Sequence, residues 1–192
     1  LSNCTNGGLI KGEEYSAGIV AGGKNVVIEN CMNLGMIQSV VMAAGIGLRD
    51  QGDYKIVNCF NGGEVICRNA YGISANVSSI GSDKVSIENT YYLQTESVNA
   101  EINLTDEMTT AVSSREVSTD EVETGMVAYL LRQGQKKMET VLWGQKLTGD
   151  QVDEQPVLGG PEGFQKKEYS GCENNPGTPT CTYSNEKKET VY

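Results

Sequence analysis

Asn30-Cys31-Met32-Asn33-Leu34-Gly35 decides the fold of this chain, because the same N-C-x-N-x-G pattern is written three times along its first half. The other copies begin at Asn3 and Asn58, and a degenerate copy at Asn89 keeps the first Asn but loses the Cys, the second Asn and the Gly. Successive copies start 27, 28 and 31 residues apart. A fixed period in the range of roughly 20–50 residues indicates a repeat architecture.

A second column of residues has the same period. The pairs Gly18-Ile19, Gly45-Ile46 and Gly72-Ile73 are 27 residues apart and fall midway between successive Asn-Cys sites. Each repeat also contains three short apolar segments separated by Asn and Gly, which fit bends because both residues tolerate left-handed backbone angles. The repeats therefore predict short strands joined by turns.

Stacked strands of this kind predict an all-β fold, a parallel β-solenoid of about three to four coils over residues 1–93. One coil cannot bury its inner face, so stacking supplies both the hydrogen bonds and the core. Analogy with known β-helices suggests a right-handed coil. Stacked Asn side chains can form an amide ladder, and stacked Cys can act as small buried hydrophobes. The predicted ladders are Leu1/Ile28/Ile56/Ile87 and Ile19/Ile46/Ile73 for the core, Asn3/Asn30/Asn58/Asn89 for the amides and Cys4/Cys31/Cys59 for the thiols.

The positions of the six cysteines do not indicate a simple disulfide framework. Equivalent positions on stacked strands lie about 4.7–4.9 Å apart, more than the Cβ separation of about 3.8 Å that a disulfide prefers. Cys67 has no counterpart in the other repeats. Cys172 and Cys181 lie in the polar tail and can bridge each other, remain free thiols, or take part in a zinc site completed from elsewhere. These counts leave the redox compartment open.

The chain after residue 93 is expected to close the solenoid. Residues 94–158 predict a small cap containing one helix near 118–133, where Ser118 and Glu121 have capping-box spacing before a run of apolar residues at helical intervals. Asn103 to Met108 can start a further short helix. Residues 159–192, rich in Gly, Pro, Lys, Glu and Asn, predict a polar linker or tail. Because Leu1 falls inside a repeat, we expect a piece of a longer protein with neighbouring domains.

Charge and composition exclude several classes of function. The net charge is −10, and residues 1–93 hold 6 basic and 8 acidic residues without a basic patch, so we expect no nucleic-acid partner and no attraction to an anionic membrane. No apolar run approaches the ~20 residues of a membrane helix, so we expect no membrane insertion. The sequence contains 0 His, which removes His-dependent catalysis and His metal sites. We predict no cofactor, no metal and no catalytic residue.

One pair of inter-coil loops carries the candidate contact residues. Arg49, Asp50 and Asp53 lie in one loop, and Asp83 lies in the corresponding loop of the next coil. Parallel β-helices include polysaccharide lyases and hydrolases that use clustered acids, so these residues can form a carboxylate cluster or a ligand-contact surface. The simpler interpretation, which we prefer, is that they are solvated turn residues selected by the backbone conformation. Trp143 is either a carbohydrate-stacking platform or part of the core of the cap.

Ile28 to Gly35, followed by Ala44-Gly45-Ile46-Gly47, resembles the GLUG-type repeats of large bacterial cell-surface proteins. Residues 125–131, 141–145 and 155–158 are similar to the block that closes such arrays, and together the matches cover residues 1–158. The fourth repeat and Arg132 depart from that pattern. The resemblance implies a secreted, extracellular or cell-surface adhesin-like protein. Similar repeats also accompany M26-type immunoglobulin A peptidases, in which a separate zinc domain performs catalysis.

These observations predict a non-catalytic repeat module of a secreted bacterial surface protein, acting as an adhesive surface or a stalk. Its expected partners are a protein or glycan of the host or of a neighbouring cell. The alternatives are an accessory region of an M26-type peptidase and a polysaccharide-active β-helix enzyme that uses the loop acids.

Overall fold

The computed structural model describes residues 1–77, 84–98, 100–103, 109–134, 143–147 and 151–158, together with strands at 165–167 and 188–190. The chain divides into two compact units, Leu1–Val117 and Ser118–Tyr192.

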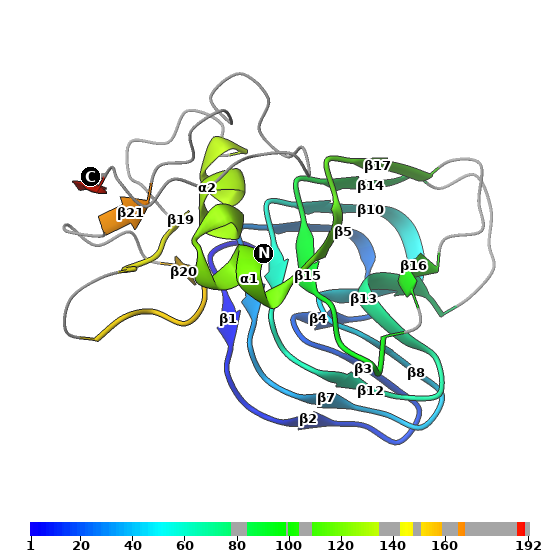
Figure 1. The fold of residues 1–192 in the computed structure, drawn as a ribbon. Helices are drawn as coiled ribbons and strands as arrows, with labels where there is room; N and C mark the ends of the chain where they lie inside the picture. The colour runs from blue at the N-terminus through cyan, green and yellow to red at the C-terminus, as the bar shows by residue number, and fades with distance from the viewer. Residues whose placement is uncertain are drawn as a thin grey trace. The chain divides into compact units, whose positions relative to one another are not determined.

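Unit 1 is a parallel β-solenoid, as predicted, with short strands stacked from coil to coil (Figure 1). Four ladders run along it, in the orders β1-β6-β11-β15-β18, β17-β14-β10-β5, β12-β7-β2 and β3-β8-β13-β9-β4, with β16 pairing β13. The strands are β1 (Thr5–Asn6), β2 (Ile10–Lys11), β3 (Tyr15–Ala17), β4 (Val20–Ala21), β5 (Lys24–Glu29), β6 (Met32–Asn33), β7 (Ile37–Gln38), β8 (Met42–Ala44), β9 (Gly47–Arg49), β10 (Gln51–Val57), β11 (Phe60–Asn61), β12 (Val65–Ile66), β13 (Ala70–Asn76), β14 (Val85–Glu88), β15 (Tyr91–Leu93), β16 (Ala100–Asn103), β17 (Thr109–Val112) and β18 (Arg115–Val117).

Apolar side chains from successive coils fill the interior of unit 1. Ile28, Ile56 and Ile87 are paired in register on β5, β10 and β14, and all three are fully buried. Ile46 and Ile73 belong to the same core cluster. Leu1, which was expected to extend the first of these ladders, is 60% exposed. Alternation of buried and exposed residues along each strand directs the intervening side chains outward.

The Gly-Ile column and the second Asn of each repeat are packed against each other, which explains why they share one period. A Cβ placed on Gly18 would lie 2.6 Å from Cγ of Asn33, and one placed on Gly45 would overlap Asn61. At Gly72 the neighbour is the ring of Tyr92, which replaces the second Asn in the degenerate repeat. Only glycine leaves room for these side chains.

Parallel pairing continues past residue 93, the predicted end of the repeats. β16 pairs with β13, β17 with β14, and β18 with β15. The bend between β17 and β18 is at Ser113, whose φ of 54° matches the left-handed Asn that begins every earlier repeat. Asn103, the first residue of the predicted short helix, ends strand β16, and residues 104–108 lie outside the described residues.

Unit 2 contains the predicted helical segment as two helices, α1 (Thr119–Glu123) and α2 (Met126–Gln133). Ser118 and Glu121 form a reciprocal capping box at the start of α1. Gly125, with a φ of 79°, separates the helices. The strands are β19 (Trp143–Gly144), paired antiparallel with β20 (Val157–Leu158), and β21 (Gln165–Lys167), paired antiparallel with β22 (Lys188–Thr190).

Trp143 is fully buried, so its indole forms part of the interior and is not presented as a stacking platform. Nearby, Nε2 of Gln145 donates to the carbonyl oxygens of Val122 (2.9 Å) and Asp153 (3.1 Å). Cys172 and Cys181 lie outside the described residues. No helix in the described part of the chain is long and apolar enough to cross a membrane.

Candidate functional site

The first Asn of each repeat forms a ladder of amides along the solenoid. Asn30, Asn58 and Asn89 have φ values of 50°, 56° and 47°, so each makes a left-handed bend. Nδ2 of Asn58 donates to Oδ1 of Asn30 at 2.6 Å, and Nδ2 of Asn89 donates to Oδ1 of Asn58 at 2.6 Å. Asn3 makes the same bend, with a φ of 55°, on the exposed first coil. The column therefore fixes the turn and connects neighbouring coils.

The second Asn of each repeat forms another ladder, which the sequence reasoning missed. Nδ2 of Asn6 donates to Oδ1 of Asn33, and Nδ2 of Asn33 donates to Oδ1 of Asn61, both at 2.7 Å. Donation runs from the earlier coil to the later one, opposite to the first ladder. The signal was available, because these residues repeat with the same spacing as the first Asn.

The cysteine column is a ladder of hydrogen-bonding groups. Sγ of Cys31 and of Cys59 donates to the carbonyl oxygen two residues earlier, at 3.2 Å in each case. Sγ of Cys59 also accepts from the backbone N–H of Cys31, at 3.4 Å. Thr90 and Ser114 continue the column with hydroxyls: Oγ1 of Thr90 accepts from Cys59 N–H at 3.3 Å, and Oγ of Ser114 accepts from Thr90 N–H at 3.1 Å.

The thiols in this column are free. Cys31 and Cys59 are fully buried, and Cys4 is partly buried. Burial raises the pKa of Cys59 well above its usual value, whereas hydrogen bonding from the Cys59 side chain lowers the pKa of Cys31. Across the described residues, no group of three or more His, Cys, Asp or Glu side chains could hold a metal ion. Because the thiols and hydroxyls of this column hydrogen-bond to the backbone of their own or a neighbouring coil, we assign the column a structural role.

The structure describes three of the four residues predicted to form ligand-contact loops, and they differ in exposure. Arg49 is 2% exposed, and its Nε donates to the carbonyl oxygen of Gly52 at 3.0 Å. The guanidinium therefore stabilises the loop and does not face solvent. Asp50 and Asp53 are exposed. Asp83 lies outside the described residues. Asp53 lines a cavity, which is described below.

Asp53 links three successive coils at the start of the β14-β10-β5 sheet. Its Oδ1 accepts from the backbone N–H of Lys84 at 3.0 Å, and its own N–H donates to Oδ1 of Asn25 at 3.1 Å. Asn25 has a φ of 55°, which turns its side chain amide toward the next coil. The bond from Lys84 orients the Asp53 carboxylate, and the bond to Asn25 holds its backbone.

A shallow cavity of about 470 Å³ lies against the same sheet. Val27 on β5 is 44% exposed, and Lys55 on β10 and Ser86 on β14 are paired with it in one outward-facing row. The cavity thus combines an apolar contact, two ammonium groups, a hydroxyl, an amide and a carboxylate. Its lining residues are Asn25, Val26, Val27, Asp53, Tyr54, Lys55, Lys84 and Ser86.

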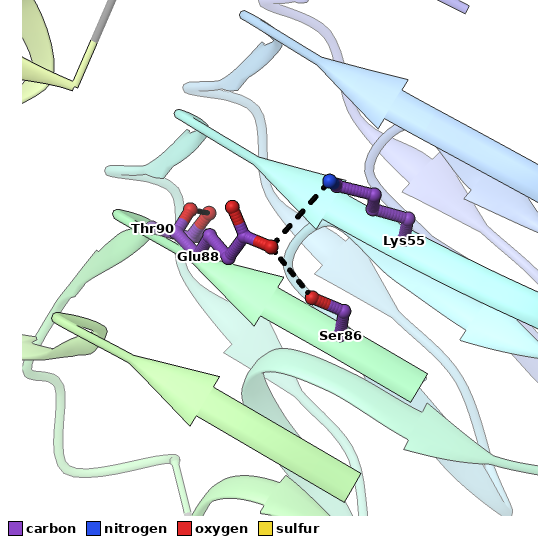
Figure 2. Close-up of polar contacts among 4 residues, drawn as sticks. All are labelled: Lys55, Ser86, Glu88 and Thr90. Atoms are coloured by element: carbon purple, nitrogen blue, oxygen red, sulfur yellow. Dashed lines mark hydrogen bonds and ion pairs between the residues drawn. The ribbon is translucent and has the colours of Figure 1, made fainter. Parts of the chain in front are cut away.

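A polar network joins two coils on this outer face (Figure 2). Nζ of Lys55 lies 3.4 Å from Oε1 of Glu88, and Oγ of Ser86 donates to the same oxygen at 2.9 Å. Thr90 is fully buried, and from the interior its Oγ1 donates to the backbone carbonyl oxygen of Glu88 at 3.0 Å. The Lys55 and Glu88 side chains are 40% and 31% exposed, so water weakens the ion pair while the bond from Ser86 orients the carboxylate.

Chemically, the described lining of the cavity offers groups that suit recognition of a ligand. Lys55 and Lys84 are hydrogen-bond donors, Asp53 is an acceptor, and Asn25 and Ser86 can act as either. Such mixed groups around an apolar surface suit a polar ligand with hydroxyl or carboxylate groups. Comparison with protein-family models, curated protein sequences and solved structures found no match. The resemblance to GLUG-type repeats therefore stays a prediction.

Proposed function

We propose that this chain is a non-catalytic repeat module of a secreted bacterial surface protein, and that its solenoid presents an adhesive surface. The cavity over β14, β10 and β5 carries this proposal. Its rim is fixed by hydrogen bonds among Asn25, Asp53 and Lys84, while Val27 and Lys55 remain partly exposed. A fixed polar rim reduces the ordering cost of binding, which favours recognition over a purely mechanical role as a stalk.

An immobilised array of glycosaminoglycans, mammalian N-glycans and extracellular-matrix proteins tests adhesion by this chain. We expect at least one class to bind, and Lys84→Ala to weaken that binding at least about fivefold by removing a charged donor. Lys11→Ala is the matched control, because Lys11 is exposed on β2, in a different sheet. Absence of binding across the array would leave the stalk as the remaining form of the proposal.

A polysaccharide-active enzyme is the second candidate, because the Asp53 carboxylate lines the cavity. Incubation with pectic and other uronic-acid polysaccharides tests it, with new reducing ends or ultraviolet-absorbing unsaturated products as the readout. Asp53→Asn keeps an oxygen for the Lys84 N–H but removes the charge. Turnover that Asp53→Asn abolishes would replace the adhesion proposal with an enzymatic one.

A surface location and an association with a peptidase would be properties of a longer protein that contains this chain. Sequencing the reading frame on both sides of residues 1–192 tests them. We expect a secretion signal and further repeats. An H-E-x-x-H domain in the same frame would instead support the peptidase-accessory alternative.

A further inference from the structure

The face formed by β2, β7 and β12, together with the turn that follows each strand, has features that the proposed adhesive cavity does not use. The three strands stack side by side, apart from the β14-β10-β5 sheet (Figure 1). Contiguous exposed apolar side chains are typical of protein-binding surfaces. On this face the exposed apolar residues are Leu9 (61%), Met36 (37%), Val40 (69%), Val41 (39%) and Ile66 (38%).

Register places residues of opposite character on successive coils of this face. Lys11, Gln38 and Ile66 are paired, and backbone bonds from Gly12 to Gln38 (3.0 Å) and from Ser39 to Ile66 (3.2 Å) carry the register into the turn. Two positions further along lie Glu13, Val40 and Arg68; the turn of the third coil is one residue shorter, because Ala70 pairs with Ala43, so Arg68 lies beside Val40 and Val41.

All three of these turn residues are exposed. One column on the surface is thus negative on the first coil, apolar on the second and positive on the third. Among the described residues, neither Glu13 nor Arg68 has an ion-pair partner within unit 1. The two charges are available to another molecule.

This column is complementary to itself under one particular symmetry. A two-fold axis that lies in the interface and runs parallel to β7 brings the first coil of one molecule against the third coil of the other. Glu13 then faces Arg68 of the second copy, Arg68 faces Glu13 of the second copy, and Val40 meets its own counterpart. Met36, on the same coil as Val40, also meets its counterpart. Two ion pairs therefore flank an apolar centre, as an isologous interface requires.

We propose that the β2-β7-β12 face binds a second copy of this chain through this two-fold contact. Three ladder spacings and about six residues of strand and turn cover roughly 14 Å by 20 Å, or about 280 Å² per molecule. Stable interfaces bury about 800 Å² per partner, so the dimer is weak. We expect a dissociation constant on the order of 0.1–1 mM at low salt.

Sedimentation equilibrium of the whole chain at up to about 1 mM, with variants Glu13→Arg and Arg68→Glu, tests the contact. Each variant alone places like charges opposite each other twice and should weaken dimerisation at least about tenfold. An equimolar mixture of the two should regain dimerisation, because every Arg of one then faces a Glu of the other. Recovery in the mixture supports a contact between residues 13 and 68 of different copies, and a mixed species that stops at the dimer supports the two-fold arrangement.

Two further variants complete the design. Val40→Glu should abolish the dimer by placing two carboxylates at its centre, whereas Val27→Glu, on the exposed face of β5, should leave it unchanged. A wild-type chain that is monomeric at 1 mM overturns the proposal. So does a mixture of Glu13→Arg and Arg68→Glu that stays monomeric, or a Val27→Glu variant that dissociates like Val40→Glu.

Discussion

The second and third repeats, which begin at Asn30 and Asn58, keep the full N-C-x-N-x-G pattern, whereas the turns at Asn89 and Ser113 have lost most of it. All four turns nevertheless make the same left-handed bend. The hydrogen bonds made by the Cys59 thiol are made by the hydroxyls of Thr90 and Ser114 in the later coils. The solenoid therefore keeps one hydrogen-bond geometry from coil to coil, and the residues of the N-C-x-N-x-G pattern are one way to provide it.

The largest expected effect comes from filling the space that the regular coils keep open. Gly45→Val should destabilise unit 1 by about 3 kcal/mol or prevent folding, because its Cβ would overlap the Asn61 amide and the carbonyl oxygen of Gly72. Urea denaturation followed by far-ultraviolet circular dichroism measures the change. Gly7→Ala is the control, since no heavy atom lies within 4 Å of a Cβ there. Equal losses in both variants would contradict the packing explanation.

Breaking the amide ladder should have the next largest effect. Asn58→Ala removes two side-chain hydrogen bonds and leaves a Cβ residue at a φ of 56°, so we expect a loss of about 2 kcal/mol. Asn58→Gly should recover about 1 kcal/mol of that loss, because glycine adopts this angle freely. The same denaturation measurement separates the two contributions. If Asn58→Gly is no more stable than Asn58→Ala, the bend contributes nothing.

The third effect concerns the column of thiols and hydroxyls, where Cys59 can be replaced by threonine, the residue found at this position in the next coil. Cys59→Thr should be more stable than Cys59→Val by about 1–2 kcal/mol, because only threonine can accept the backbone N–H of Cys31. The two side chains have nearly the same shape, so the difference isolates the hydrogen bond. Thermal unfolding of both variants measures it. Equal stability would show that the column only fills space.

The smallest effect is expected on the outer face of the sheet. Lys55→Met should change the free energy of unfolding by less than about 1 kcal/mol, since the pair with Glu88 is 40% and 31% exposed. The difference between wild type and variant should shrink further in 1 M salt, where exposed charges are screened. A loss above about 2 kcal/mol would place this ion pair among the main supports of the fold.

Much of the fold of unit 1 could be predicted because its residues repeat at a fixed period. The period of Asn30 and Asn58 predicted the parallel solenoid, and Ser118 with Glu121 predicted the start of α1. The continuation of the solenoid to Val117 was not predicted. Ser113 makes the bend that Asn makes in the earlier repeats, and Ser114 accepts the hydrogen bond that Cys accepts there, but neither residue matches the repeated pattern. The burial of Arg49 was missed for a different reason. A charged loop residue is expected in solvent, and only the fold shows that its guanidinium closes onto Gly52.

The opposed directions of the two asparagine ladders bear on how long such a solenoid can grow. In an α-helix, aligned peptide units sum to about half an elementary charge at each end. Here the side-chain amides donate toward earlier coils in one column and toward later coils in the other. Their dipoles largely cancel, so each added coil contributes almost no net polarity along the axis. Rows of identical amides can therefore be extended without building up an electrostatic penalty at the ends.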